Sequence, residues 1–168
     1  RTLTARTVLI ATGGWPVVDR KVIGYEHLIT SNEAFQLPKL PKRIAIVGGG
    51  YIAVEFAGIF AGLGSEVTLV YRGEKILRGF DEDLRDELML AMAAEGITLK
   101  MNNTVAKIEE APKGCRKATY VSGDDDEFDI VFFATGRTPN TAGIGLDKAG
   151  VELKEGGAVK VDDNSRTN

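Results

Sequence analysis

The stretch Arg43-Ile-Ala-Ile-Val-Gly-Gly-Gly-Tyr-Ile-Ala-Val-Glu-Phe-Ala57 decides the fold. Its first five residues form a mostly apolar run, which is typical of a strand buried on both faces. The three glycines predict a tight turn. The apolar residues that follow predict a helix over residues 51–63, with Gly64 at its C-terminal end. Strand, turn and helix in this order open a βαβ unit.

Further elements continue this pattern. We expect a strand over residues 66–71, a helix over 81–95 with acidic residues in its first turn, and a strand over 97–101. Strands that alternate with helices pair in parallel through crossover connections. Short strands predicted at 105–109, 116–121 and 127–134 indicate an antiparallel meander that leads into one last buried strand. The predicted fold is α/β: a Rossmann-like three-layer domain with a parallel sheet, crossover helices and an antiparallel β-meander.

Composition and charge narrow the classes of function. The chain has 168 residues, 43% of them hydrophobic, and its 21 Lys and Arg nearly balance 24 Asp and Glu. This balance offers no broad cationic surface for nucleic acid, and the apolar runs are shorter than the roughly 18 residues of a membrane helix. Cys115 is the single cysteine, so no intrachain disulfide can form. Without a leader at its start, the chain is expected in the cytoplasm.

The flanking segments predict less regular structure. Residues 7–11 form a short apolar run that we expect to be a buried strand without a partner in this chain. Residues 17–40 contain spaced prolines and are typical of a linker with a short helix near 31–35. After residue 140 the chain is rich in turns, with one candidate strand over 158–161.

The glycine turn carries the first candidate site. The spacing Gly48-x-Gly50-x-x-Ala53 between a strand and a helix is that of a dinucleotide-binding turn. Gly48 permits the tight turn, Gly50 lets the backbone approach a pyrophosphate, and Ala53 allows close packing of the helix on the strand. The free N–H groups of the helix N-terminus, which includes Ile52, face the anion. The alternative is a tight turn that binds nothing.

The end of the second strand indicates which dinucleotide binds. Enzymes that use NAD place an acidic residue there for the ribose 2′-hydroxyl, whereas this strand ends with Tyr71 and Arg72. Arg72 can form a charge-assisted contact with a 2′-phosphate, and Arg78 can reach the same phosphate if the chain turns between them. The sequence therefore favours NADPH. The alternative is that both arginines, like Lys75 in the same loop, are ordinary solvated cations.

Three segments carry a resemblance to a known family. Residues 47–57, 70–81 and 133–140 resemble the pyridine-nucleotide domain of glutathione reductases, which are class I FAD-dependent pyridine nucleotide-disulfide oxidoreductases. The resemblance implies that Tyr51 covers the nicotinamide pocket and that Glu55 lies near the carboxamide; a packed aromatic and a solvated carboxylate are the alternatives. It also implies residues that hold the rest of NADPH and residues on the FAD side: Ala134, Thr135, Gly136 and Arg137 for NADPH, and Ala11, Thr12 and Gly13 for FAD. The turn at Gly136 and Arg137 can also be purely structural.

The resemblance further implies that the chain is part of a longer enzyme. Residues 1–14 would be a trailing strand of the FAD domain, 15–40 a linker, 41–140 the NADPH-binding domain, and 141–168 a segment returning toward the FAD domain. The redox disulfide, most FAD contacts and the dimerisation domain would lie outside this chain, which would therefore hold no catalytic residue and no metal. The full-length homodimer would reduce oxidised glutathione with NADPH and FAD, and the isolated chain would be inactive.

One position departs from the family, and other functions remain open. Gly73 stands where the family often has a third basic side chain, which leaves two cations for the 2′-phosphate. Other substrates are possible, as in enzymes of the trypanothione, mercuric or lipoamide type. A free-standing NADP-binding regulatory module is an alternative of another class, although the expected orphan strand at residues 7–11 argues against it.

Overall fold

The computed structural model describes residues 2–168, which divide into two compact units. The larger unit is Pro16–Gly136. The smaller unit combines residues 2–15 with Arg137–Asn168. The short strands β1 (Gly14–Pro16) and β9 (Arg137–Pro139) form a two-stranded sheet. Pro16, the last residue of β1, already belongs to the larger unit.

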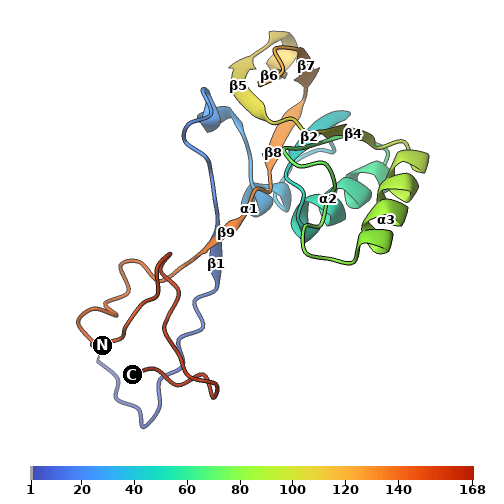
Figure 1. Ribbon diagram of the computed structural model, residues 1–168. Coiled ribbons are helices and arrows are strands. Elements are labelled where there is room, and N and C mark those ends of the chain that lie inside the picture. The colour runs from blue at the N-terminus through green and yellow to red at the C-terminus, as the bar shows by residue number, and fades with distance from the viewer. Residues whose placement is uncertain (1) are drawn as a thin grey trace. The chain divides into compact units, whose positions relative to one another are not determined.

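A four-stranded parallel sheet forms the centre of the larger unit (Figure 1). Its strands run in the order β4-β3-β2-β8. They are β2 (Arg43–Val47), β3 (Glu66–Tyr71), β4 (Thr98–Met101) and β8 (Ile130–Phe133). The central strand β2 pairs in parallel with both β3 and β8 and is buried from Ile44 to Val47, which explains its apolar sequence.

Two helices cover one face of this sheet. Ile44 and Ile46 of β2 share a core with Phe56 and Phe60 of helix α2 (Tyr51–Gly62) and with Met92 of helix α3 (Glu82–Ala94). The predicted helix ends are confirmed. Gly64 and Gly96 have φ angles of 98° and 82° and follow the two helices, and the Asp81 side chain caps the start of α3 by accepting from the N–H groups of Asp83 and Leu84.

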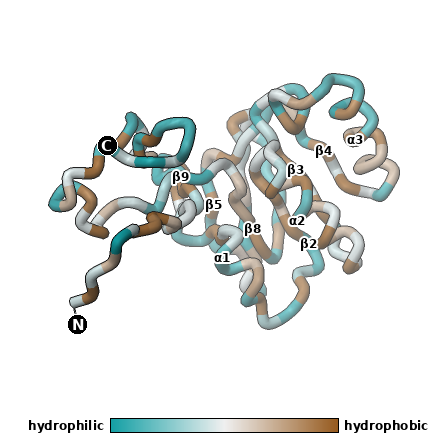
Figure 2. Tube along the Cα trace, turned by 90° about the horizontal axis from the view of Figure 1, so that it is seen from below, coloured by the Kyte–Doolittle hydropathy of each residue, from teal (hydrophilic) through white to brown (hydrophobic). Residues whose placement is uncertain are grey.

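The antiparallel meander covers the opposite face. It consists of β5 (Val105–Glu110), β6 (Arg116–Tyr120) and β7 (Asp125–Phe128), with a 3-10 turn at Pro112–Gly114 between the first two strands. Ala45 and Val47, which alternate with Ile44 and Ile46 along β2, share a second core with Ile108 of this layer. Figure 2 shows hydrophobic brown along the central strands between the two layers. The predicted three-layer α/β fold is confirmed.

The segment that precedes β2 within the larger unit contacts the rest of that unit. It contains a 3-10 helix at Tyr25–His27 and the predicted short helix, α1 (Ser31–Ala34), which begins with a capping box between Thr30 and Glu33. Ile29 bridges to Phe132 of β8. No helix in residues 2–168 has the length and apolar character needed to cross a membrane.

Two predicted strands are wrong. The run at residues 7–11, for which no partner in this chain was expected, pairs with nothing in residues 2–168, and Val8 and Leu9 are 78% and 86% exposed. That this run pairs as a strand outside this chain stays a prediction. Residues 127–134 are two strands, β7 and β8, separated at Asp129, whose carboxylate turns to accept backbone N–H groups of Lys42 and Arg43. Residues 158–161 contain only an isolated bridge between Leu153 and Val159, because the surrounding glycine-rich turns leave no longer ladder.

Candidate functional site

A cavity of about 610 Å³ lies in the larger unit at the carboxyl ends of the parallel strands. Open α/β sheets bind ligands at this edge, and the volume is that of a typical small-molecule site. The cavity is lined by the ends of β2, β3 and β8, by the loop after β3, by the start of β5 and by residues that follow β1. The lining residues are Val17, Val18, Asp19, Val22, Val47, Gly48, Gly49, Gly50, Val70, Tyr71, Arg72, Arg78, Thr104, Val105, Phe133 and Thr135.

The glycine turn fits the two tasks expected of it. Gly48 has a φ angle of 147°, and a Cβ there would lie 2.3 Å from the carbonyl oxygen of Ala134, the residue that follows β8. Gly48 therefore lets β2 and the end of β8 approach closely. A Cβ on Gly50, in contrast, would meet no atom within 4 Å, so this glycine opens onto free space at the cavity.

The N-terminus of α2 is available to an anion. Gly50 is the N-cap, and no side chain caps the helix. The N–H of Val54 makes the first intrahelical bond, to the carbonyl of Gly50 at 3.2 Å. The N–H groups of Tyr51, Ile52 and Ala53 precede it and have no intrahelical acceptor. Together with the helix dipole they favour a negatively charged group.

The loop after β3 brings both predicted arginines to this cavity. The N–H of Leu77 donates to the carbonyl of Gly49 at 2.6 Å, which ties the loop to the glycine turn. Arg72 and Arg78 are exposed, line the same cavity, and form no ion pair within residues 2–168. Two guanidinium groups without an ion-pair partner in the described residues therefore lie beside the glycine turn, as the spacing predicted.

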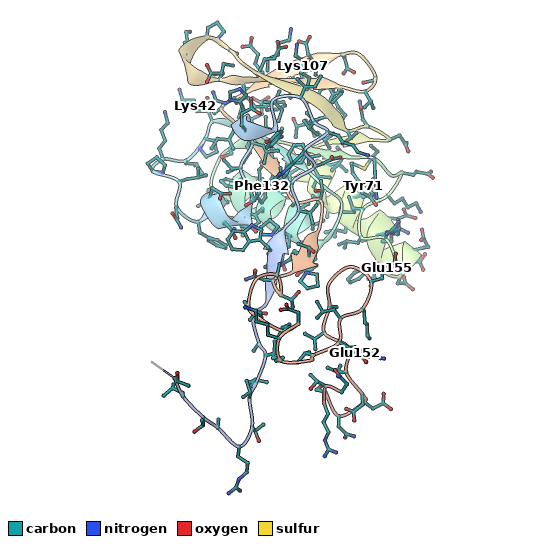
Figure 3. All side chains as sticks on the ribbon, turned by 90° about the vertical axis from the view of Figure 1, so that its left-hand side faces the viewer. Lys42, Tyr71, Lys107, Phe132, Glu152 and Glu155 are labelled. Atoms are coloured by element: carbon teal, nitrogen blue, oxygen red, sulfur yellow. The ribbon has the colours of Figure 1, made fainter. Side chains whose placement is uncertain are left out.

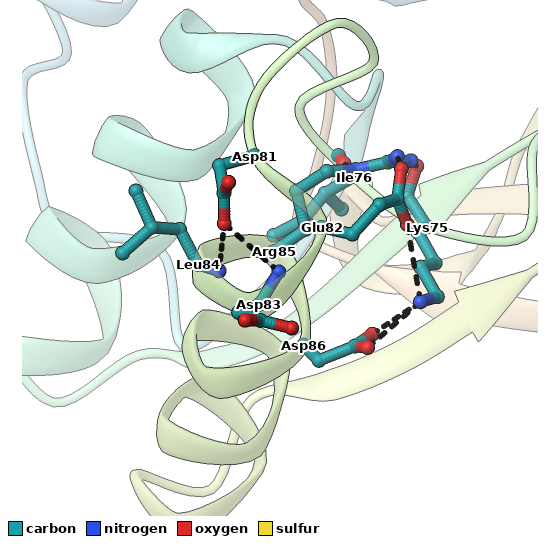
Figure 4. Close-up of polar contacts among 8 residues, drawn as sticks. All are labelled: Lys75, Ile76, Asp81, Glu82, Asp83, Leu84, Arg85 and Asp86. Atoms are coloured by element: carbon teal, nitrogen blue, oxygen red, sulfur yellow. Dashed lines mark hydrogen bonds and ion pairs between the residues drawn. The ribbon is translucent and has the colours of Figure 1, made fainter.

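Helix α3 holds this loop in place, a feature that the sequence reasoning missed (Figure 4). The Arg85 guanidinium donates to the carbonyls of Ile76 at 2.7 Å and Lys75 at 2.9 Å. Lys75 is not merely solvated, as was expected: its ammonium pairs with Asp86 and Glu82, and the hydrogen bonds that it donates to these carboxylates raise the pKa of Lys75. The i,i+3 spacing of Glu82 and Arg85 could have suggested an ion pair, but not a contact with the preceding loop.

Tyr71, labelled in Figure 3, is the last residue of β3. A Cβ on Gly49 would lie 2.5 Å from its Cγ, and a Cβ on Gly73 would lie 2.6 Å from its Cε1. The ring therefore fills space that side chains at both positions would need. This gives a steric reason for glycine at residue 73, where a third cation was missing from the pattern.

The other predicted residues lie outside the cavity lining, except Thr135. Tyr51 and Glu55 are exposed on α2, one turn apart. Ile52 and Ala53 lie in the first turn of that helix, and Ala134 and Gly136 flank Thr135. Arg137 belongs to the smaller unit, where its guanidinium donates to the carbonyl of Gly14. Ala11, Thr12 and Gly13 belong to the smaller unit as well.

Sequence reasoning missed the wall that residues 17–22 form; this segment is called the strap below. It contributes Val17, Val18, Asp19 and Val22 to the cavity, although its irregular sequence indicated a linker. The two adjacent valines after Pro16 were the available signal, because an apolar pair in a solvated linker is unusual.

Cys115 and His27 lie away from the cavity. The Cys115 thiol lies 3.8 Å from Asp129, and His27 lies near Glu26 and Glu110 at 3.8 and 3.9 Å. Among residues 2–168, no three His, Cys, Asp or Glu side chains are grouped as a metal ion would require.

Comparison with known proteins gives a consistent set of relatives. A family model described as pyridine nucleotide-disulphide oxidoreductase matches residues 1–168. Glutathione reductase from Burkholderia cepacia is 48% identical over 165 residues, which are 98% of this chain and 36% of that protein. Trypanothione reductase from Trypanosoma congolense is 47% identical over an alignment of 169 positions, which covers 99% of this chain and 34% of that protein.

A solved structure agrees with these relatives. The HOCl-induced flavoprotein disulfide reductase RclA from Escherichia coli matches with a TM-score of 0.85 and 30% identity, over 94% of this chain and 36% of that one. The chain spans about a third of the length of the relatives that it matches.

Proposed function

The chain belongs to the pyridine nucleotide-disulphide oxidoreductases, a family of enzymes, and from this premise we propose that its larger unit is the NADPH-binding domain of a glutathione-disulfide reductase. One observation carries the proposal. The cavity joins a glycine turn, an uncapped helix N-terminus and two arginines without ion-pair partners in residues 2–168. Pyrophosphate and a 2′-phosphate are the two anionic groups that such a combination fits.

The geometry of the residues fits NADPH. Gly50 leaves open space where a side chain would exclude a pyrophosphate, and the N–H groups of Tyr51 to Ala53 are free to donate to its oxygens. Arg72 and Arg78 would share the 2′-phosphate. Arg72 and not an acidic residue directly follows Tyr71, so the end of β3 lacks the carboxylate that selects the unphosphorylated ribose.

The residues of this chain bind and orient the coenzyme. The glycine turn fixes the pyrophosphate, the arginines select the phosphorylated ribose, and Tyr51 and Glu55 would address the nicotinamide from the exposed side of α2. Ala134 to Arg137 would hold the intervening part, and Ala11 to Gly13 would face FAD. The chemistry that NADPH supplies when bound is hydride donation to FAD, whose site we propose lies mostly outside this chain.

We propose oxidised glutathione as the substrate of the whole enzyme. Glutathione reductases from Burkholderia cepacia, a Nostoc strain and Pisum sativum are 48%, 49% and 42% identical to this chain. A trypanothione reductase is 47% identical, so the disulfide substrate needs its own test. Turnover of the full-length protein with NADPH should be faster with oxidised glutathione than with trypanothione disulfide; the reverse order would replace the substrate and leave the coenzyme site intact. A homodimer and a cytoplasmic location stay predictions.

Calorimetric titration of the 168-residue chain with 2′,5′-ADP and with 5′-AMP tests the coenzyme site. We expect 2′,5′-ADP to bind at least about tenfold more tightly, because each charge-assisted contact contributes roughly 1.5 to 3 kcal/mol. The preference should fall with added salt and disappear in the double variant Arg72→Ala and Arg78→Ala.

A control double variant that removes the same two positive charges elsewhere in the chain separates the loss of a phosphate contact from the change in net charge. Arg6 and Arg166 are exposed in the smaller unit and form no ion pair within residues 2–168, so Arg6→Ala with Arg166→Ala should keep the preference. Equal binding of both ligands by the wild type would show that Arg72 and Arg78 do not select the phosphorylated ribose. Failure to bind either ligand would mean that the glycine turn is only structural in this chain.

A further inference from the structure

The strap is attached at both of its ends. At Val17 its N–H donates to the carbonyl of Gly136 at 3.0 Å, and its carbonyl accepts from the Thr135 hydroxyl at 3.3 Å. Just beyond the strap, Ile23 joins β5: its N–H donates to Ala106 at 3.1 Å, and its carbonyl accepts from Ile108 at 2.8 Å. The strap therefore crosses from the end of β8 to the meander as a fixed wall of the cavity.

Asp19 is the charged residue among the four residues of the strap that line the cavity. Its Oδ1 accepts from the N–H of Lys21 at 3.0 Å and its carbonyl accepts from Val22 at 3.1 Å, which forms a local turn. Within residues 2–168, Oδ2 accepts no hydrogen bond and the carboxylate forms no ion pair. A carboxylate in a cavity that takes phosphates repels them, and a hydrogen bond that it accepts from the ligand would offset this cost.

The cavity is the adenosine half of the proposed coenzyme site. It contains Arg72 and Arg78, assigned to the phosphate on the adenosine ribose, but neither Tyr51 nor Glu55, assigned to the nicotinamide. Val18, Val22 and Val105 line the same cavity as Asp19 and supply apolar surface, which suits a flat aromatic ring. The base beside the strap is then adenine.

We propose that Asp19 is a specificity-determining residue whose carboxylate accepts a hydrogen bond from the exocyclic amino group of adenine. The inference rests on the proposed function. An ionised carboxylate can only accept hydrogen bonds, and the amino group is the N–H donor of the adenine base once its N9 carries ribose. Hypoxanthine has a carbonyl oxygen at that position, so two acceptors would face each other.

Calorimetric titration with 2′,5′-ADP and with inosine 2′,5′-bisphosphate tests this contact. We expect the wild type to bind the adenine ligand about tenfold more tightly, since a hydrogen bond to a charged group discriminates at this level. Asp19→Ala should bring the ratio close to one. Asp19→Asn keeps an acceptor oxygen and the contact with Lys21, so it should retain part of the preference. Asp163→Ala, at an exposed aspartate of the smaller unit, should leave the ratio unchanged.

An unchanged ratio of the two affinities in Asp19→Ala would overturn the inference, whether both affinities stay the same, fall equally or rise equally. An equal rise would mean that Asp19 only repels phosphate. Thermal unfolding followed by circular dichroism checks that each variant is folded. This inference alone fails if the wild type prefers 2′,5′-ADP over 5′-AMP but the ratio of the affinities for the adenine and hypoxanthine ligands does not depend on Asp19. If the wild type binds none of these ligands, the proposed function fails and the inference fails with it.

Discussion

The ring of Tyr71 lies so close to Gly49 that a Cβ at residue 49 would be 2.5 Å from Cγ of the tyrosine. The same ring would lie 2.6 Å from a Cβ at Gly73. The end of β3, the glycine turn and the loop that carries Arg72 are therefore packed around one aromatic side chain. A change at any of these three positions is expected to act through the other two.

Gly73→Ala should lower the free energy of unfolding by about 1 to 3 kcal/mol, because the added methyl group forces the Tyr71 ring to move. In the Tyr71→Ala background the same change should be close to neutral. Urea denaturation of the wild type, both single variants and the double variant gives the coupling energy. Gly58→Ala is the control: its Cβ meets open space on helix α2, so it should stabilise by about 0.5 to 1 kcal/mol. Equal costs of Gly73→Ala in both backgrounds would show that the ring is not the cause.

Arg85→Lys should weaken binding of 2′,5′-ADP several-fold although it keeps the charge. Arg85 donates to two carbonyls of the loop between Arg72 and Arg78, and a lysine cannot reproduce the planar pair of donors. Binding of 5′-AMP should change less, which calorimetry can measure. Arg116→Lys is a matched control, because Arg116 also donates to two carbonyls, those of Gly114 and Cys115, in the meander. If both ligands lose affinity equally, Arg85 does not act through the phosphate loop.

Asp129→Asn should lower stability at neutral pH and not in strong acid. The carboxylate accepts the N–H groups of Arg43 at 3.0 Å and Lys42 at 2.7 Å. The bond from Arg43 lowers the pKa of Asp129 most, burial opposes it, and the bond from Lys42 adds to the lowering. A folded pKa below the unfolded value of about 3.9 means that the stabilisation is complete above that pH and is lost as the pH falls through the folded pKa.

Urea denaturation across pH measures this effect. At pH 7 the variant should be less stable than the wild type by about 1 kcal/mol, and the difference should shrink once the pH falls below about 4. Asp163→Asn, at an exposed carboxylate, should show no such trend. A difference that stays constant down to strong acid would assign the effect of Asp129 to packing instead of charge.

The sequence predicted the elements whose signals are local. The apolar run of β2, the glycine turn, the acidic first turn of α3 and the glycine at residue 64 each depend on neighbouring residues, and all lie where they were expected. The break between β7 and β8 could not be predicted in this way, because Asp129 finds its partners 86 and 87 residues away.

The candidate site likewise contains residues that local spacing predicted and features that depend on packing. The spacing of Gly48, Gly50, Arg72 and Arg78 predicted one cavity, and all four residues line it. The strap and the Arg85 contacts depend on how segments pack against one another, and the pair of valines after Pro16 was the one local signal for the strap. Backbone hydrogen bonds hold the loop and the strap. Almost every residue type can form such bonds, so the amino-acid sequence gives little sign of them.

Gly50→Ala and Gly48→Ala should separate binding from folding. At Gly50 the φ angle is −88° and a Cβ meets no atom within 4 Å, so alanine fits the free protein. Its methyl group would nevertheless occupy the space proposed for the pyrophosphate. We expect near wild-type unfolding in urea and a loss of NADPH affinity of at least about tenfold, because close approach of the backbone to the phosphates is prevented.

Gly48→Ala should instead damage the fold itself. Its φ angle of 147° strains any other residue, and its Cβ would lie 2.3 Å from the Ala134 carbonyl oxygen, which is backbone and cannot turn away as a side chain can. We expect a loss of stability of several kcal/mol, with binding lost as a consequence. If Gly50→Ala binds NADPH as well as the wild type does, the open space at this glycine is not the pyrophosphate site, and the turn serves only to join β2 to α2.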